Sequence, residues 1–231
     1  IKALQTEPGT NHDDLFRVEW AYLPLLDRHH DASPKLLERR LANDPGFFCE
    51  VIRLVFRSKK EERAAEEITE ERKNVASNAY RLLSEWRTPP GLGEDGTYDG
   101  VALIAWLDAV KKECSDTGHL EMAMPMVGSV LVHTLADPDG LWIHRSAATA
   151  LNAKDAGDMR DGFRTALYNS RGVHLVDPTG NAERELADKY RTRAEVAEAS
   201  GYHRFATIFR ELADSYEHEA EWVSSRESFG D

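Results

Sequence analysis

Apolar residues recur every three or four positions along most of the chain, which is the spacing of one face of an α-helix. The repeat stops and restarts at clusters of proline, glycine and capping residues. We therefore predict an all-α protein of about ten helices with no strand. The expected helices cover residues 15–26, 35–42, 46–57, 69–87, 99–118, 120–135, 143–153, 155–171, 182–199 and 202–225.

Several of these helices have a recognisable first residue. Asn11, Asp44, Thr69 and Asp99 each stand where a side-chain oxygen can accept a hydrogen bond from the first turn. Ser33-Pro34 and Asp44-Pro45 combine such a cap with a proline at the first helical position. Pro24 interrupts the first apolar segment, so the helix there either kinks or restarts.

The connections are short, which favours antiparallel neighbours. An irregular helical bundle and a solenoid of helix pairs of the HEAT or TPR kind both fit, because no fixed repeat recurs. Residues 1–231 are expected to form one helical domain that ends in a long helical hairpin. The segment 88–98, rich in proline and glycine, is a candidate subdomain boundary between residues 1–87 and 99–231.

The charge balance argues against two classes of partner. The chain has 41 acidic and 29 basic residues, a formal charge of −12, which repels nucleic acid and anionic membrane surfaces. The densest basic run, residues 57–73, holds six basic residues and six glutamates and fits a solvated mixed-charge segment. No run of about 18 apolar residues and no signal peptide is seen.

Cys49 and Cys114 both lie in apolar-periodic segments, so we interpret them as small core residues in a reducing compartment, with a disulfide as the alternative. A cytoplasmic location follows from that interpretation. The chain begins with Ile1 instead of Met, which is compatible with a piece of a longer protein.

A metal site is not expected. His29 and His30 are adjacent and so point to different sides of a helix, and Asp27 with His30 is too small a ligand set for structural zinc. The sequence has no HExxH, no paired CxxC, no calcium loop and no ExxH pair of a di-iron bundle. The carboxylates between Glu61 and Glu71 alternate with basic residues and fit a solvated face.

No catalytic residue and no cofactor are predicted either. The chain lacks a GxSxG elbow, and neither cysteine carries a catalytic signature. The glycine-rich stretch 91–96 contains acidic residues where a nucleotide phosphate needs donors. We interpret it as a loop.

Three residues are candidates for binding. Asn169 and Arg171 stand at the carboxyl end of a helix, where they can recognise a carboxylate or, alternatively, satisfy terminal carbonyls before Gly172. Trp142 follows a turn beside His144 and Arg145 and is a candidate partner-facing aromatic residue, with a core anchor as the alternative.

Five stretches of the chain resemble segments of uncharacterised helical regions in large bacterial proteins, including actinobacterial ones. They are EWAYLPLLD from Glu19, PKLLERRLANDPGFFCEVIRLVF from Pro34, AYRLLSEWRTPPG from Ala79, YNSRGV from Tyr168 and ERELADKYR from Glu183. The resemblance transfers no function. It implies that this chain belongs to a multidomain protein.

We therefore expect a non-catalytic helical scaffold or protein-interaction module, whose partner is another protein or a neighbouring domain of the same chain. One alternative is a small-molecule-binding sensor or enzyme with a site inside the helical bundle. Another is the regulatory helical region of a nucleotide-driven switch protein.

Overall fold

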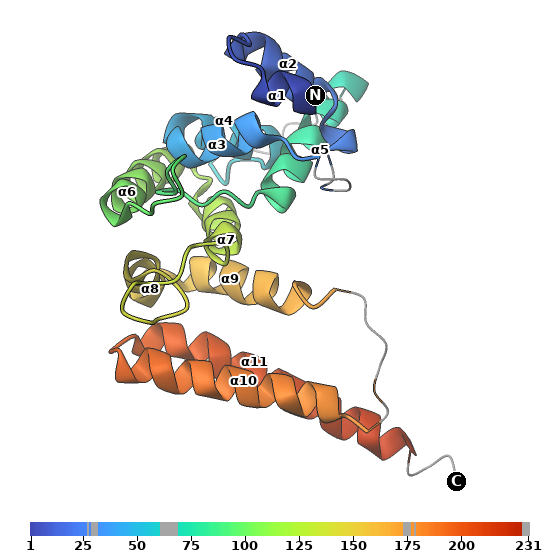
Figure 1. Ribbon diagram of the computed structural model, residues 1–231, viewed down its shortest axis with the longest axis vertical. Helices are drawn as coiled ribbons and strands as arrows, with labels where there is room; N and C mark the ends of the chain where they lie inside the picture. Colours follow the sequence, from blue (N-terminus) through green and yellow to red (C-terminus); the bar gives the residue numbers. More distant parts are fainter. Residues whose placement is uncertain (27, 29–31, 61–68, 173–176, 178, 228–231) are drawn as a thin grey trace. The chain divides into compact units, whose positions relative to one another are not determined.

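The computed structural model describes residues 1–26, 28, 32–60, 69–172, 177 and 179–227. Within these ranges the chain is all-α, as predicted, with eleven α-helices, one 3₁₀-helix and no strand (Figure 1). The single β-type contact among the described residues is an isolated bridge between Leu92 and Tyr98. Helix lengths run from 5 to 25 residues, so the described helices do not form a regular repeat.

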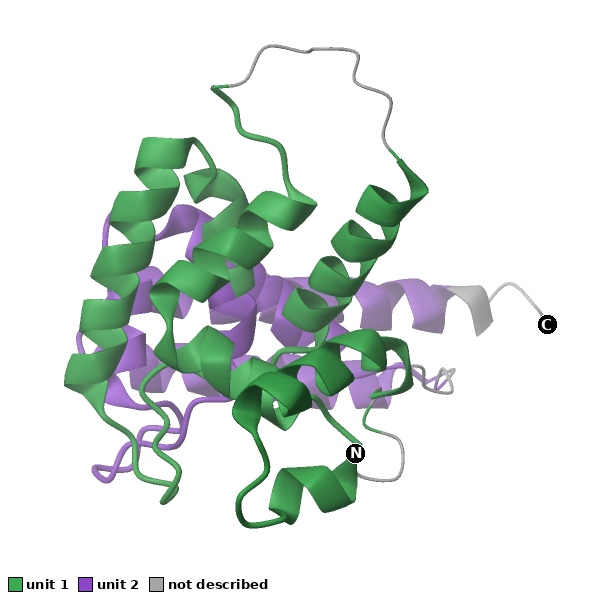
Figure 2. Cartoon of the chain, turned by 90° about the horizontal axis from the view of Figure 1, so that it is seen from above, with its two compact units in different colours: residues 1–126 green, residues 127–231 purple. Residues whose placement is uncertain are grey.

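The helices belong to two compact units, residues 1–126 and 127–231, coloured separately in Figure 2. Helix α7 contains the border. Unit 1 holds α1 Lys2–Thr6, α2 His12–Ala21, η1 Leu23–Leu25, α3 Lys35–Asn43, α4 Pro45–Val55, α5 Glu70–Glu85, α6 Gly100–Thr117 and the start of α7 Leu120–Leu131. Unit 2 holds the end of α7, α8 Arg145–Asn152, α9 Gly157–Asn169, α10 Asn181–Ala199 and α11 His203–Glu227.

Four helices begin at the caps expected from the sequence. The Asn11 side chain accepts from the backbone N–H of Asp13, and those of Asp44, Thr69 and Asp99 act in the same way for α4, α5 and α6. Each cap satisfies a donor that has no partner within the helix, worth about 1 kcal/mol. Local sequence therefore decides where these helices start.

Elsewhere the boundaries differ from the expectation. The first predicted helix ends at Ala21, and Pro24 lies in η1, because proline cannot donate to the helical ladder. Pro34 is the N-cap residue of α3 instead of its first helical residue. Helix α7 ends at Leu131, four residues early, and the apolar pattern did not predict the short helix α1.

The core of unit 1 is built around α4, which packs against α3, α5 and α6. Phe48 of α4 lies between Trp86 and Trp106, with ring centroids 5.6 and 5.0 Å away. The indole N–H of Trp106 donates to the carbonyl of Leu41 at 3.1 Å, so burial leaves this polar group satisfied. Both tryptophans are buried and anchor the core of unit 1.

The core of unit 2 is the α10–α11 hairpin, which reverses at Gly201 with φ of 83°. Tyr190 and Tyr216 stack with centroids 5.7 Å apart across the two helices. Phe163 of α9 meets Phe205 of α11 edge to face at 5.4 Å. Figure 1 shows α9 along this hairpin, and the aromatic contacts explain how it is held there.

The segment proposed as a boundary, residues 88–98, lies inside unit 1. Its backbone is a loop closed on itself, since Gly93 N–H donates to the Thr97 carbonyl at 2.8 Å and Asp99 N–H to the Gly91 carbonyl at 2.7 Å. Gly91 adopts φ of 88°, where a β-carbon would lie 2.5 Å from the Asp99 carbonyl oxygen. The division between the units falls instead within α7, between Met126 and Val127.

Gly128 of α7 lies against the backbone of α9, and its substitution tests that packing. A β-carbon there would lie 1.9 Å from the Met159 carbonyl oxygen of α9. We expect Gly128→Ala to lower the free energy of unfolding by about 1–3 kcal/mol, measured by urea denaturation followed by circular dichroism. Gly157→Ala is the matched control, because no atom lies within 4 Å of the position that a β-carbon would take there. The control should be neutral or slightly stabilising, and equal losses in both variants would contradict this packing.

Candidate functional site

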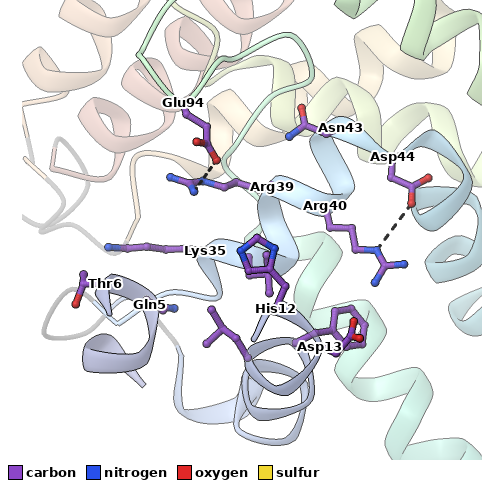
Figure 3. A pocket seen from close by; sticks show the side chains of 13 residues that line it. Gln5, Thr6, His12, Asp13, Lys35, Arg39, Arg40, Asn43, Asp44 and Glu94 are labelled. Atoms are coloured by element: carbon purple, nitrogen blue, oxygen red, sulfur yellow. Dashed lines mark hydrogen bonds and ion pairs between the residues drawn. The ribbon is translucent and has the colours of Figure 1, made fainter. Parts of the chain in front are cut away.

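A cavity of about 590 Å³ opens in unit 1 between α1, α2 and α3 (Figure 3). Lys35 and Arg39 are four residues apart on α3 and therefore share one face of that helix. His12 of α2 projects toward them in Figure 3. On the far side, Arg40 stacks on the Phe16 ring with its guanidinium 5.0 Å from the centroid.

A buried carboxylate fixes the start of α3 beside this cavity. Glu19 of α2 is 0% exposed and accepts from the backbone N–H groups of Leu36 and Leu37 at 3.2 and 3.0 Å. The side chain of Gln5 donates to the same carboxylate at 2.6 Å. Because α3 has no cap side chain of its own, Glu19 supplies the acceptor and the negative charge that a helix amino terminus favours.

A second buried carboxylate, Glu38, joins α3 to the end of α5. It is hydrogen-bonded to the Arg28 guanidinium, and it accepts from the Arg87 N–H at 3.1 Å and the Thr88 hydroxyl at 3.0 Å. Burial raises the pKa of the Glu38 carboxyl, and the positive charge of Arg28 opposes that shift. Arg28 also donates to the Glu85 carbonyl at 2.8 Å while holding a left-handed φ of 67°.

A second cavity of about 410 Å³ borders Glu38 and shares Lys35, Arg39, Asn43 and Glu94 with the first. Its described lining is mostly charged or polar. A cavity lined by charged and polar side chains binds ligands through ion pairs and hydrogen bonds. Neither cavity pairs a nucleophile with a base among its described lining residues.

Arg171, a predicted binding residue, is engaged in an ion pair inside unit 2. Its guanidinium lies 2.6 Å from a carboxylate oxygen of Glu183, whose side chain is 2% exposed, and 3.7 Å from Glu219. It also lies over the Tyr216 ring at 5.7 Å, and burial raises the pKa of Tyr216 to about 12. Arg171 thus links the end of α9 to α10 and α11.

Asn169 does not join Arg171 in that cluster. Its side chain is exposed and makes no hydrogen bond with any residue that the structure describes, while its carbonyl accepts from the Gly172 N–H at 3.0 Å. The pair therefore does not form one site in the described structure. Backbone N–H groups of the residues that follow, among them Ser170 and Gly172, satisfy carbonyls at this helix end.

Trp142 is half-buried on the hairpin of unit 2. Its ring meets Phe209 edge to face at 5.2 Å and stacks with Phe205 at 6.4 Å, and the Arg193 guanidinium lies 5.3 Å from its centroid. These contacts are those of an anchor between the α7–α8 connection and the hairpin. Burial lowers the pKa of Arg193, which reflects the same apolar surroundings.

Asp137 organises the turn before Trp142. Its buried carboxylate accepts from the Arg145 guanidinium at 2.8 and 2.9 Å and from the Arg145 backbone N–H at 2.9 Å. The hydrogen bonds from Arg145 hold the pKa of Asp137 well below its usual range. Sequence reasoning found the turn but not this partner, because nothing local marks Arg145 as its donor.

The thiols of Cys49 on α4 and Cys114 on α6 are buried and free, with their sulfur atoms 3.5 Å apart. The hydrogen bond between them and burial raise the pKa of the Cys49 thiol. Among the described residues no group of three or more metal-ligating side chains comes together. Asp27, His29, His30 and residues 61–68 lie outside the described part of the chain.

Helix α6 presents an apolar face to the surface. Residues 100–107, GVALIAWL, contain no charged side chain. Leu103, Trp106 and Leu107 are buried in the core, whereas Val101 is 80% and Ile104 40% exposed. Ala102 and Ala105 are exposed beside them. The sequence pattern placed Val101 and Ile104 in a helix but did not show which of its apolar residues face outward. The lack of charged residues on any side of 100–107 was the signal that some of them would be exposed.

No protein-family model, curated protein or solved structure matches this chain. In the part of the chain that the structure describes, every helix is too short or too polar to cross a lipid bilayer. The function must therefore be argued from the two cavities, the buried ion pairs and the outward face of α6.

Arg171→Met tests whether the Arg171–Glu183 pair is structural. Removing the guanidinium leaves a buried carboxylate without its 2.6 Å partner, so we expect a loss of about 3 kcal/mol in the free energy of unfolding in urea. The double variant Arg171→Met/Glu183→Met should lose less than the single variant, since no unpaired charge remains. An Arg171→Met variant as stable as the parent would show that the arginine is free for a ligand instead.

Proposed function

We propose that this chain is a non-catalytic helical scaffold that binds a protein partner through the outward face of α6. The observation that carries the proposal is the exposure of Val101 and Ile104 on two helical turns that contain no charged side chain. A helix that is apolar on every side is normally buried on every side. Contiguous exposed apolar patches on soluble proteins mark interaction sites.

The energetic gain from covering this face is substantial. Fully burying an exposed valine side chain is worth about 1.5–3 kcal/mol, and Ile104, which is 40% exposed, adds a smaller gain. The exposed alanines Ala102 and Ala105 let a partner helix approach closely. A few such residues at the centre of an interface supply most of its affinity. The α6 face is suited to be that centre.

The charges at the ends of the face favour one kind of partner. Asp99 caps the amino end of α6, and the exposed Asp108 follows Ile104 by four residues. The whole chain carries a formal charge of −12. A partner that presents apolar side chains rimmed by lysine or arginine is therefore complementary. It is either a separate protein or a neighbouring domain of the same chain.

The buried polar groups support a structural role over chemistry. Glu19, Glu38, Asp137 and Glu183 are all engaged by donors of their own unit. Carboxylates engaged in this way hold segments of the chain together. The free, buried thiols of Cys49 and Cys114 fit the reducing environment of the cytoplasm, where we place the chain.

A photo-crosslinking side chain at position 101 tests this proposal. With benzoylphenylalanine in place of Val101, irradiation of the cells that make this protein should yield a discrete adduct with one partner. The same replacement at Val196, an exposed valine of α10 in unit 2, is the matched control and should not yield it. Mass spectrometry of the adducts identifies the partner.

The identified partner, purified, is then titrated against the full chain. Val101→Glu with Ile104→Glu should weaken binding at least tenfold while circular dichroism shows that the variant stays folded, because Val101 is 80% and Ile104 40% exposed. Val196→Glu should bind like the parent. Equal adducts at the two positions, or unchanged affinity in the double variant, would rule out α6 as the interface.

A further inference from the structure

Four cationic side chains and two carboxylates line the second cavity of unit 1 among the described residues. The described lining includes Arg28, Lys35, Arg39 and Arg87. Arg28 is engaged with Glu38. The Lys35 ammonium and the Arg87 guanidinium make no hydrogen bond and no ion pair with any residue that the structure describes.

Most of the described arginines bridge carboxylates, as Arg53 does with Glu113 and Arg164 with Glu211, in a protein with a formal charge of −12. The two carboxylates of the described lining, Glu38 and Glu94, are hydrogen-bonded to Arg28 and Arg39, so Lys35 and Arg87 add further positive charge to the hollow. Like charges that share a cavity repel each other until an anion enters it.

The third cation, Arg39, is held only weakly. It lies 3.0 Å from Glu94, and the two side chains are 51% and 79% exposed. Ion pairs as exposed as this contribute about 0.2–1 kcal/mol, so a charged ligand can replace Glu94 as the partner of Arg39. Glu94 belongs to the loop 88–98, whose glycines let that loop turn tightly beside the cavity.

The remaining lining limits the ligand to a small polar one. Ser33, Asn43 and Thr88 offer hydrogen-bonding groups, Leu92 is the sole aliphatic side chain among the described lining residues, and none of them is aromatic. The described lining therefore offers no aromatic or broad apolar surface against which a nucleobase or a steroid could pack. The volume of about 410 Å³ is ample for a compact anion and lies in the range of small-molecule sites.

We propose that this cavity binds a compact oxyanion with two negative charges, a phosphate group or a short dicarboxylate, between Lys35, Arg39 and Arg87. The forked guanidinium groups suit both oxyanions, because each can donate two parallel hydrogen bonds. Ligand binding displaces Glu94 from Arg39. This site adds a small-molecule function to the interface on α6 and does not depend on that interface.

Isothermal titration of the full chain with inorganic phosphate and, separately, with succinate tests the proposal, with acetate as the singly charged comparator. We expect saturable binding at one site by at least one of the two dianions, weaker binding of acetate, and an affinity that falls as salt is added. If only one of the two dianions binds, the site recognises a phosphate group or a dicarboxylate, respectively. If both bind, the site recognises the two negative charges and not the shape of the ligand.

Variants then locate the site. Lys35→Gln with Arg87→Gln should weaken the binding at least tenfold, while Lys112→Gln, which removes an exposed charge of α6 that has no partner among the described residues, should leave it unchanged. Glu94→Gln should tighten it about two- to fivefold by releasing Arg39. Failure of both dianions to bind, or full binding by the Lys35→Gln/Arg87→Gln variant, would overturn the proposal.

Discussion

Buried carboxylates that accept hydrogen bonds from distant segments hold the helices of each unit in register. Apolar burial drives the helices together, but it has no direction and leaves their relative rotation open. A carboxylate in the interior must be satisfied by donors at fixed angles, and leaving it unsatisfied costs several kcal/mol. The four carboxylates that do this are Glu19 and Glu38 in unit 1 and Asp137 and Glu183 in unit 2.

The position of α3 shows how this constraint reaches the candidate sites. Glu19 holds its first turn and Glu38 ties its middle to the end of α5, so buried charge places the amino-terminal half of α3. Lys35 and Arg39 project from that face into the two cavities. The interior acids stabilise the fold, and the cations that they position remain available at the surface.

The second cavity and the α6 face share one structural element. The loop 88–98 contributes Glu94 to the cavity wall and leads directly to Asp99, the cap of α6. Glu94 and Asp99 therefore belong to one continuous segment of the chain. In unit 2, the predicted binding residues Arg171 and Trp142 contact other residues of the same unit. Arg171 pairs with Glu183, and Trp142 packs on Phe205 and Phe209.

The sequence alone determined the all-α class, most helix positions and the caps Asn11, Asp44, Thr69 and Asp99, because a cap and its donors lie within three residues of each other. It also contained the apolar run of α6. Only the tertiary structure decided which face of that run stays exposed, that Arg171 meets a carboxylate 12 residues away, and that Glu19 reaches α3 across 18 residues. Such contacts depend on how helices cross in space, and no local pattern of residues encodes the partner of a buried charge.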